Sequence, residues 1–190
     1  ICPYYNKPDQ AGLEAHFTAI DAAVSLPIIL YNVPSRTACD LLPETVGRLA
    51  KLPNVVGIKD ASNDLGRVSM HAALTQGEQF TQLSGEDPSS LGHRAMGGTG
   101  CISVSANVAP ELCAQMHAAF DAGDLETARR LDQRLIHIHK AMFLSPSPGP
   151  AKHVLAKMGL CSDDVRLPIV APDTTTRGRI DDAMTDARLH

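Results

Sequence analysis

The chain has 190 residues, of which 44% are hydrophobic and 20% charged, and its formal net charge is −4. This length is enough for one domain with a sizeable core, and the composition is ordinary for a globular protein. The negative charge argues against a nucleic-acid partner, which would require a basic surface. No apolar run approaches the roughly 20 residues that span a bilayer, so a membrane-spanning protein is not expected.

The five cysteines are scattered, without a Cys-x-x-Cys pair, at Cys2, Cys39, Cys101, Cys113 and Cys161. This arrangement suits reduced thiols in a cytoplasm better than a disulfide framework or a zinc site. No basic, apolar and small-residue succession opens the sequence, so we expect no signal peptide. The chain begins at Ile1 without Met, as though in the last residues of a strand, and we expect it to be a fragment.

Short apolar runs predict buried strands. The run Val55-Val56-Gly57-Ile58-Lys59 predicts a strand that is buried on both faces. We expect a strand end within residues 1–5 and strands at residues 27–31, 55–59, 80–84 and 100–104.

Helices are expected between and after the strands, where apolar residues recur at helical spacing. Asp9 is the expected N-cap of the first helix, and Asp87 that of the fourth. Residues 32–40 are expected to form a loop. We expect helices at residues 9–24, 43–51, 65–75, 89–96, 110–122, 125–143, 151–158 and 174–189.

The same spacing predicts which side chains point inward. In the third helix these are Leu65, Val68, Ala72 and Leu74. Apolar residues also recur at helical spacing in the first helix, at Leu13, Phe17, Ile20 and Val24, and they lie on one stripe of the longest helix, at Leu131, Leu135, Ile138 and Met142. Strands that alternate with helices of this length predict a parallel sheet. Periodicity alone leaves a doubly wound sheet and a barrel as alternatives, although no Gly-x-Gly-x-x-Gly motif supports dinucleotide binding.

Lys59 lies at the carboxyl end of the predicted strand 55–59. In a parallel barrel this end of a strand faces the active site. Desolvation lowers the pKa of a lysine, and a neutral amine can attack a carbonyl to form a Schiff base. For this residue taken alone, the alternative is a lysine whose ammonium group extends to solvent.

Other polar or special residues fall at or near successive strand ends, and a barrel would bring them to one mouth. They are Tyr5, Tyr31, Arg36, Gly85, and Ile102 within the fifth predicted strand. Taken singly, Tyr31 could be a core residue with its hydroxyl at the rim, and Arg36 a surface charge. Together with a lysine, a phenol and a guanidinium suit carbonyl chemistry on an acidic substrate.

Three further features are interpreted as structural. Gly97-Gly98-Thr99-Gly100 is expected to form a tight turn rather than a phosphate cradle, because no helix-opening Lys or Ser/Thr signature accompanies it. His137 and His139 are two residues apart and do not share a helix face, so we expect no metal site there. Glu86-Asp87 could be an acid pair, but a capping role for Asp87 is favoured.

Five motifs occur in order along the chain. They are Pro3-Tyr4-Tyr5-Asn6-Lys7-Pro8, Tyr31-Asn32-Val33-Pro34-Ser35-Arg36-Thr37, Gly57-Ile58-Lys59-Asp60-Ala61, Leu83-Ser84-Gly85-Glu86-Asp87 and Gly100-Cys101-Ile102-Ser103-Val104. As an ordered series they resemble the 4-hydroxy-tetrahydrodipicolinate synthases, also called the dihydrodipicolinate synthase family. The resemblance covers essentially the whole chain.

This resemblance implies a (β/α)8 TIM barrel of the class I aldolase type. The chain would hold about strands 4–8 with their helices and a C-terminal helical extension. We expect residues 1–122 to be the C-terminal part of the barrel and residues 123–190 a helical region. The family's first three strands and a Thr-Thr pair of its proton relay are not in this sequence, so we expect the 190 residues alone to be inactive.

The resemblance also assigns roles to single residues. Lys59 would be the Schiff-base lysine that takes up pyruvate, Tyr31 a proton relay, and Tyr5 a tyrosine offered across a dimer interface. Arg36 would bind the carboxylate of aspartate semialdehyde. Gly85 and Ile102 would line the pyruvate pocket, and Tyr4 would belong to an allosteric lysine site.

The implied reaction is the condensation of pyruvate with L-aspartate 4-semialdehyde in diaminopimelate and lysine biosynthesis. The lyase would need no metal or organic cofactor, because the lysine itself is the electron sink. A cytoplasmic homotetramer, a dimer of dimers, is implied, without nucleic-acid or membrane partners. The alternatives are N-acetylneuraminate lyase or a keto-deoxy sugar acid aldolase, which lack an arginine matching Arg36, and a catalytically silent truncated homologue.

Overall fold

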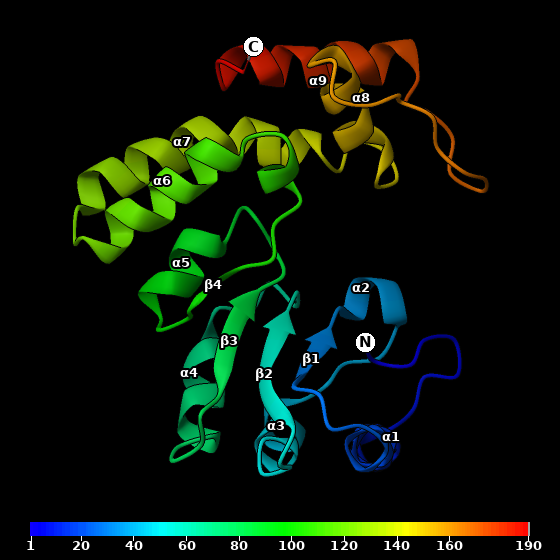
Figure 1. Ribbon diagram of the computed structural model, residues 1–190, viewed down its shortest axis with the longest axis vertical. Helices are drawn as coiled ribbons and strands as arrows, with labels where there is room; N and C mark the ends of the chain where they lie inside the picture. The colour runs from blue at the N-terminus through cyan, green and yellow to red at the C-terminus, as the bar shows by residue number, and fades with distance from the viewer. Residues whose placement is uncertain (190) are drawn as a thin grey trace. The chain divides into compact units, whose positions relative to one another are not determined.

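Four parallel strands form one sheet in the order β1-β2-β3-β4 (Figure 1). They are β1 (Ile28–Asn32), β2 (Val55–Asp60), β3 (Thr81–Ser84) and β4 (Gly100–Cys101). The computed structural model describes residues 1–189. It divides into two compact units, Ile1–Ile102 and Ser103–His190, and the sheet belongs to the first.

The register places Tyr31, Lys59, Leu83 and Gly100 beside one another on successive strands. Alternate residues of a strand point to opposite faces, so Ile29 shares the face of Tyr31 and Lys59. We call this the open face, because Ile29 is 42% exposed. Exposure on this face is confined to the β1 side, because Val55 and Gly57 of β2 are buried on the side of Lys59 and Ile58 is buried on the other. The prediction that the strand at residues 55–59 is buried on both faces is therefore confirmed for these three residues.

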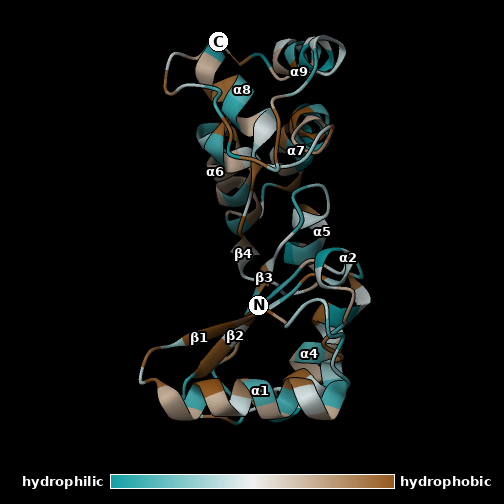
Figure 2. Ribbon diagram, turned by 90° about the vertical axis from the view of Figure 1, so that its right-hand side faces the viewer, coloured by the Kyte–Doolittle hydropathy of each residue, from teal (hydrophilic) through white to brown (hydrophobic). Residues whose placement is uncertain are grey.

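The opposite face, which carries Leu30, Asn32, Ile58, Asp60 and Gln82, is here called the covered face. Leu30 and Ile58 belong to a buried core to which two helices contribute. Helix α1 (Gln10–Ala23) supplies Leu13 and Phe17, and helix α3 (Pro43–Leu49) supplies Val46 and Leu49. Figure 2 shows the apolar β1 and β2 above α1, whose surface alternates between apolar and polar residues.

Two capping residues were predicted for the helices of this unit. The N-cap prediction for Asp9 is confirmed, because its carboxylate accepts the N–H of Gly12 at 2.8 Å. The cap predicted at Asp87 is wrong. Helix α5 (Ser90–Ala95) instead starts after Ser89, whose side chain makes no capping bond.

Two expectations near the amino terminus need correction. The opening residues form no strand, although the N–H of Cys2 donates to the carbonyl of Tyr31 at 3.0 Å and ties this segment to β1. The predicted loop 32–40 contains a one-turn helix, α2 (Pro34–Thr37), started by proline at its first position and closed by Ala38 in the left-handed region.

Helix α4 (Gly66–Leu74) buries a different side than its apolar residues predict. Val68 is buried as expected, but Leu65, Ala72 and Leu74 are exposed. Instead His71 is buried, with only 1% of its surface exposed. The position on the helix, rather than the polarity of the side chain, decides what faces the sheet.

The second unit is helical. It contains a 3-10 turn at Ser105–Asn107 and the helices α6 (Pro110–Asp121), α7 (Leu125–Ala141), α8 (Gly149–Lys157) and α9 (Thr174–Asp186). The strand predicted at 100–104 shortens to two residues, and Val104 leads into the 3-10 turn. The inward stripe predicted for α7, at Leu131, Leu135, Ile138 and Met142, is confirmed because all four are buried.

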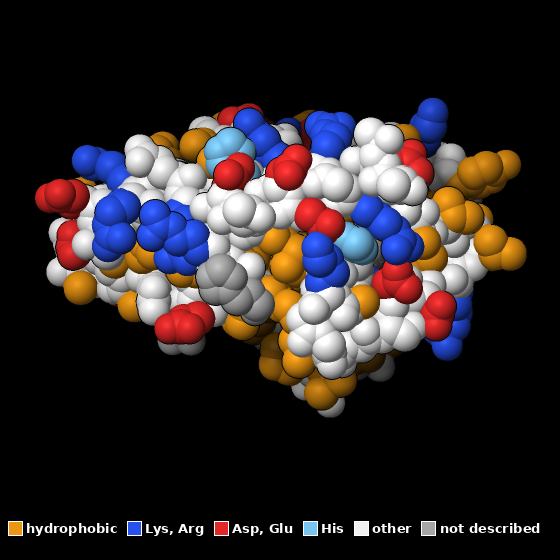
Figure 3. Space-filling model, turned by 90° about the horizontal axis from the view of Figure 1, so that it is seen from above, with side chains coloured by type: hydrophobic (Ala, Val, Ile, Leu, Met, Phe, Trp, Pro, Cys, Tyr) orange, Lys and Arg blue, Asp and Glu red, His pale blue; other side chains and the backbone are white. Residues whose placement is uncertain are grey.

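Ion pairs join the last helices of this unit. Asp181 of α9 accepts from His153 at 2.9 Å and from Lys157 at 2.8 Å, both on α8. Figure 3 shows basic and acidic side chains interspersed on the face that it presents, rather than one single-sign patch. Among residues 1–189, no helix combines the length and the hydropathy that a membrane crossing requires.

Candidate active site

Lys59 and Tyr31 lie side by side on the open face, at the carboxyl ends of β2 and β1. The Lys59 Nζ atom is 4.0 Å from the centroid of the Tyr31 ring. A cation over a tyrosine ring is attracted by the negative face of the ring. The parallel register thus brings together two side chains that are far apart in the sequence, as the predicted barrel mouth required.

Gly85 borders the aliphatic part of the Lys59 side chain. The Gly85 N–H donates to the main-chain carbonyl of Asp60 at 2.7 Å, which fixes the turn after β3 against the end of β2. A Cβ atom on Gly85 would lie 3.1 Å from Lys59 Cε and 2.8 Å from Ala61 Cβ. The missing side chain therefore leaves the room that Lys59 occupies.

Ile102 follows β4 and continues its pairing with β3, since its N–H donates to the Ser84 carbonyl at 2.9 Å. Its side chain is 45% exposed. Ile102 is two residues beyond Gly100, which lies in register with Leu83, the neighbour of Lys59. This places Ile102 at the same end of the sheet as Lys59.

Arg36 is exposed on α2, and the structure forms no ion pair between Arg36 and another residue in the range 1–189. The segment that carries it is nevertheless anchored on both sides. Asn32, at the end of β1, donates to Asp40 at 2.8 Å and accepts the N–H of Leu41 at 3.0 Å. Arg36 therefore extends from a fixed segment near the Tyr31 end of the sheet.

Asp40 is also held by Arg67 of α4, with nitrogen–oxygen distances of 2.8 and 2.5 Å to the two carboxylate oxygens. Hydrogen bonds from Arg67 hold the pKa of Asp40 below its usual value, against the opposing effect of burial. Sequence reasoning missed this anchor. Its one visible signal was Asn32, an amide at the end of an apolar strand.

Tyr4 and Tyr5 are 70% and 86% exposed. Neither hydroxyl forms a hydrogen bond with a residue of the described chain, and neither ring contacts Lys59. Tyr5 has a φ of 69°, which turns the chain sharply after Pro3. Within the described residues, the structure therefore does not bring these two tyrosines to Lys59.

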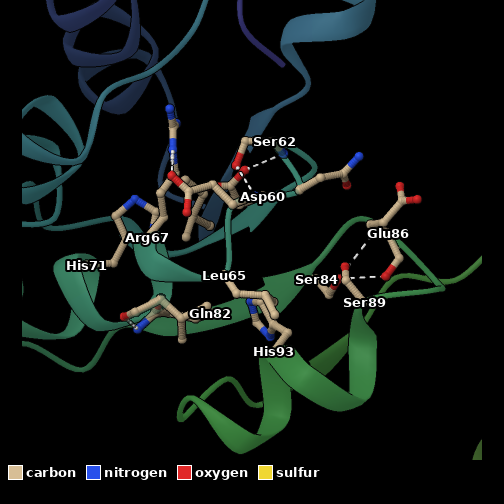
Figure 4. A pocket seen from close by; sticks show the side chains of 14 residues that line it. Asp60, Ser62, Leu65, Arg67, His71, Gln82, Ser84, Glu86, Ser89 and His93 are labelled. Carbon is tan, nitrogen blue, oxygen red and sulfur yellow. Dashed lines mark hydrogen bonds and ion pairs between the residues drawn. The ribbon is translucent and has the colours of Figure 1, made fainter. Parts of the chain in front are cut away.

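A polar pocket lies on the covered face, behind Lys59. Figure 4 shows Asp60 of β2, His71 of α4, Gln82 of β3 and His93 of α5 converging on it. Burial lowers the pKa of both His71 and His93, with the Asp60 charge acting in the opposite direction. No sequence pattern singled out this group, although Gln82 is a polar residue within a short strand.

The arrangement on the open face suits an amine nucleophile. Lys59 supplies the amine, Tyr31 supplies an adjacent phenol, and Gly85 leaves space beside Lys59. Within residues 1–189, no group of three or more His, Cys, Asp or Glu side chains is placed to hold a metal ion. All five cysteines are free thiols.

Comparison with known proteins gives a consistent result. A sequence model described as the Dihydrodipicolinate synthetase family matches residues 1–187. The 4-hydroxy-tetrahydrodipicolinate synthase of Hyphomonas neptunium is 64% identical over 191 residues, which cover 100% of this chain and 65% of that protein. The synthase of Cereibacter sphaeroides is 52% identical over 189 residues, with the same two coverages. The chain thus spans about 65% of the length of these curated relatives.

Solved structures agree with the sequence relatives. A monomeric dihydrodipicolinate synthase variant superposes with a TM-score of 0.95 at 36% identity, over 100% of this chain and 64% of that one. The chloride-inhibited synthase from Acinetobacter baumannii, complexed with pyruvate, gives 0.94 at 39% identity, over 99% and 64%. These likenesses confirm the predicted TIM-barrel class, of which the chain holds four parallel strands with their helices.

Proposed function

Because the chain belongs to the dihydrodipicolinate synthetase family, we propose that the protein containing it condenses pyruvate with L-aspartate 4-semialdehyde. The product is 4-hydroxy-tetrahydrodipicolinate, an intermediate of diaminopimelate and lysine biosynthesis. The observation that carries this proposal is the placement of Lys59 Nζ 4.0 Å from the Tyr31 ring on the open face of a parallel sheet. This is where the family's motifs require an imine-forming amine.

The reaction begins when the neutral amine of Lys59 attacks the keto carbon of pyruvate, and water leaves to form an imine. Loss of a methyl proton converts the imine to an enamine, whose carbon attacks the aldehyde of the second substrate. Cyclisation through the amino group of that substrate then releases Lys59. The protonated imine is the electron sink, so the proposed mechanism uses neither a metal nor an organic cofactor.

Tyr31 is proposed to move protons during these steps, which its position beside Lys59 supports. Gly85 and Ile102 are proposed to border pyruvate, supported by the 3.1 Å between Lys59 Cε and a Cβ built on Gly85. Arg36 is proposed to bind the carboxylate of aspartate semialdehyde, because its guanidinium is exposed and matches a carboxylate in shape.

Tyr5 is proposed to act in a neighbouring subunit's active site, and Tyr4 to belong to a lysine-binding site. Their high exposure supports a role in contact with another chain or ligand. We further propose a cytoplasmic homotetramer. Light scattering coupled to gel filtration tests this subunit number; a monomer, as in one similar solved variant, would overturn it.

Borohydride reduction in the presence of pyruvate tests the proposed function. We expect a covalent adduct on Lys59 of the whole protein, located by peptide mass spectrometry. The Lys59→Arg variant should form none. Lys51→Arg, which changes an exposed lysine of the same unit, should react like the wild type. An adduct on another lysine, or no adduct in the wild type, would overturn the assignment.

A further inference from the structure

The pocket behind Lys59 contains buried polar atoms that no protein atom satisfies. Asp60 Oδ2, His71 Nε2, Gln82 Oε1 and His93 Nδ1 are all buried, and none forms a hydrogen bond of normal geometry with residues 1–189. Gln82 lies close enough to His71 to interact with that imidazole, which leaves Asp60 Oδ2 as the charged atom without a partner. Leaving one such atom unpaired costs about 1–3 kcal/mol, and more for a charged group. The cost is largest for the Asp60 carboxylate, which therefore indicates a partner other than a protein atom.

The size of the pocket indicates which kind of molecule can be the hydrogen-bond partner of these atoms. Within the cavity, the centre of a water molecule can occupy a volume of about 20 Å³. One water needs roughly 10–15 Å³ measured in this way, together with two to four polar partners. The pocket meets both conditions, whereas an organic ligand would not fit. Gly98 lies against the His93 ring so closely that a Cβ would be 1.9 Å from Nδ1, which fixes that imidazole in place with Nδ1 on the Gly98 side.

Asp60 connects this pocket to Lys59. Its Oδ1 atom accepts the N–H of Ser62 at 2.7 Å and so shapes the turn that ends β2. Its main-chain carbonyl accepts the N–H of Gly85 at 2.7 Å, beside the Lys59 side chain. Oδ2 has no hydrogen-bond partner among residues 1–189, and it lies on the side of the strand opposite to Lys59.

We propose that this cavity is a hydration site, in which ordered water bridges the Asp60 carboxylate to the imidazoles of His71 and His93 and thereby holds the end of β2 that carries Lys59. Water donates to Asp60 Oδ2 and to an unprotonated imidazole nitrogen, and accepts from an imidazole N–H. Asp60 is then a positioning residue for Lys59, and this part of the inference rests on the proposed function.

The groups that face the cavity determine how it responds to protons. They are Asp60 of β2, Asp64 of the following turn, Arg67 and His71 of α4, Glu86 after β3, and His93 of α5, with Arg94 of α5 acting on His93. Arg67 is engaged with Asp40, so it does not replace water as the partner of Asp60 Oδ2. Burial lowers the pKa of both imidazoles, so they are neutral at pH 8 and water is the bridge between them and the carboxylate.

A crystal structure of the whole protein at pH 8, at a resolution that shows water, tests the hydration site directly. We expect water within about 2.7–3.2 Å of Asp60 Oδ2 and of an imidazole nitrogen of His71 or His93. An empty cavity would overturn the proposal. So would a direct hydrogen bond from Asp60 Oδ2 to either imidazole.

The Asp60→Asn variant tests the positioning role. It keeps an oxygen for the Ser62 N–H and nearly the same volume, but it removes the charge. We expect the rate of imine formation with pyruvate to fall roughly 10-fold, since a misplacement of about 1 Å can cost as much as 10²-fold. We also expect the NMR titrations of His71 and His93 to move to lower pH, because the carboxylate favours the imidazolium form.

A purely structural role for Asp60, through Ser62, would survive in Asp60→Asn and leave the rate of imine formation unchanged; that result would overturn the positioning role. His153→Leu removes a buried histidine of the second unit and should leave both titrations as in the wild type. If the wild type forms no trappable adduct, the proposed function fails. The water positions in the crystal structure still decide the hydration site.

Discussion

The two faces of β2 differ in the residues that surround them. On the open face, Lys59 meets the ring of Tyr31, and the exposed Ile29 lies on the same strand as Tyr31. On the covered face, Ile58 is 1% exposed within the apolar core, and Asp60 borders a polar pocket. Successive residues of a strand point to opposite sides of the sheet. Three consecutive residues of β2 therefore have different roles: Ile58 packs in the core, Lys59 is the proposed nucleophile, and Asp60 is the proposed positioning residue.

If the open face is where chemistry occurs, Tyr31→Phe should have the largest effect among changes that keep the nucleophile. This variant retains the ring beside Lys59 Nζ and removes only the hydroxyl. A general acid–base group is typically worth about 10²–10⁴ in rate, and we expect the condensation rate to fall within that range. Steady-state kinetics measure the loss. An unchanged rate would show that Tyr31 only packs against the lysine.

Substituting one isoleucine on each face compares the contributions of the two faces to the free energy of unfolding. Ile58→Ala should lower the free energy of unfolding by about 2–5 kcal/mol, because it opens a cavity in the core. Ile29→Ala, at a 42% exposed position of the neighbouring strand, should cost less than about 1 kcal/mol. Denaturant unfolding measures both. Equal losses would show that the open face is covered in the whole protein.

Arg36→Ala should separate the two substrates on the open face. A charge-assisted hydrogen bond is worth about 1.5–3 kcal/mol, so use of aspartate semialdehyde should fall roughly 10- to 100-fold. Borohydride trapping of pyruvate should change little, because imine formation precedes the second substrate. Arg48→Ala, an exposed arginine on α3 paired with Glu14, is the matched control. Equal loss of both steps in Arg36→Ala would make it a scaffold residue.

The smallest expected effect concerns the covered face, whose buried histidines should make the free energy of unfolding depend on pH. Burial lowers the pKa of His71 and His93 from 6.5 in the native state, so the unfolded chain binds protons first as the pH falls. The free energy of unfolding should therefore decrease as the pH drops below about 6.5, by at most about 1.4 kcal/mol per pH unit for each histidine.

His71→Leu should remove one of these contributions and flatten the dependence of unfolding on pH. His16→Leu, which changes an exposed histidine of α1, should keep the wild-type slope. Chemical denaturation at several pH values between 5 and 8 measures both slopes. If the slope of His71→Leu equals that of the wild type, His71 is not a neutral buried imidazole.

Local patterns were sufficient for the regular elements. The capping bond of Asp9, the apolar stripe of α7 and the strands β1 to β3 lie where spacing and composition predict them. Short or irregular pieces were missed, namely α2 and the early end of β4. A four-residue helix carries too little periodicity to stand out, and the end of β4 depends on how far its neighbour β3 extends.

The sequence by itself determined the alternation of strands and helices, the lysine at the end of β2, and the family to which the chain belongs. Only the tertiary structure decided that His71 rather than Leu74 is buried, and that His71, Gln82 and His93 meet around Asp60. The physical reason is that periodicity reports the average polarity of a face, whereas a buried polar group is defined by partners on other elements. The register between strands, which no single segment encodes, brings Tyr31 to Lys59 and places Asp60 behind them.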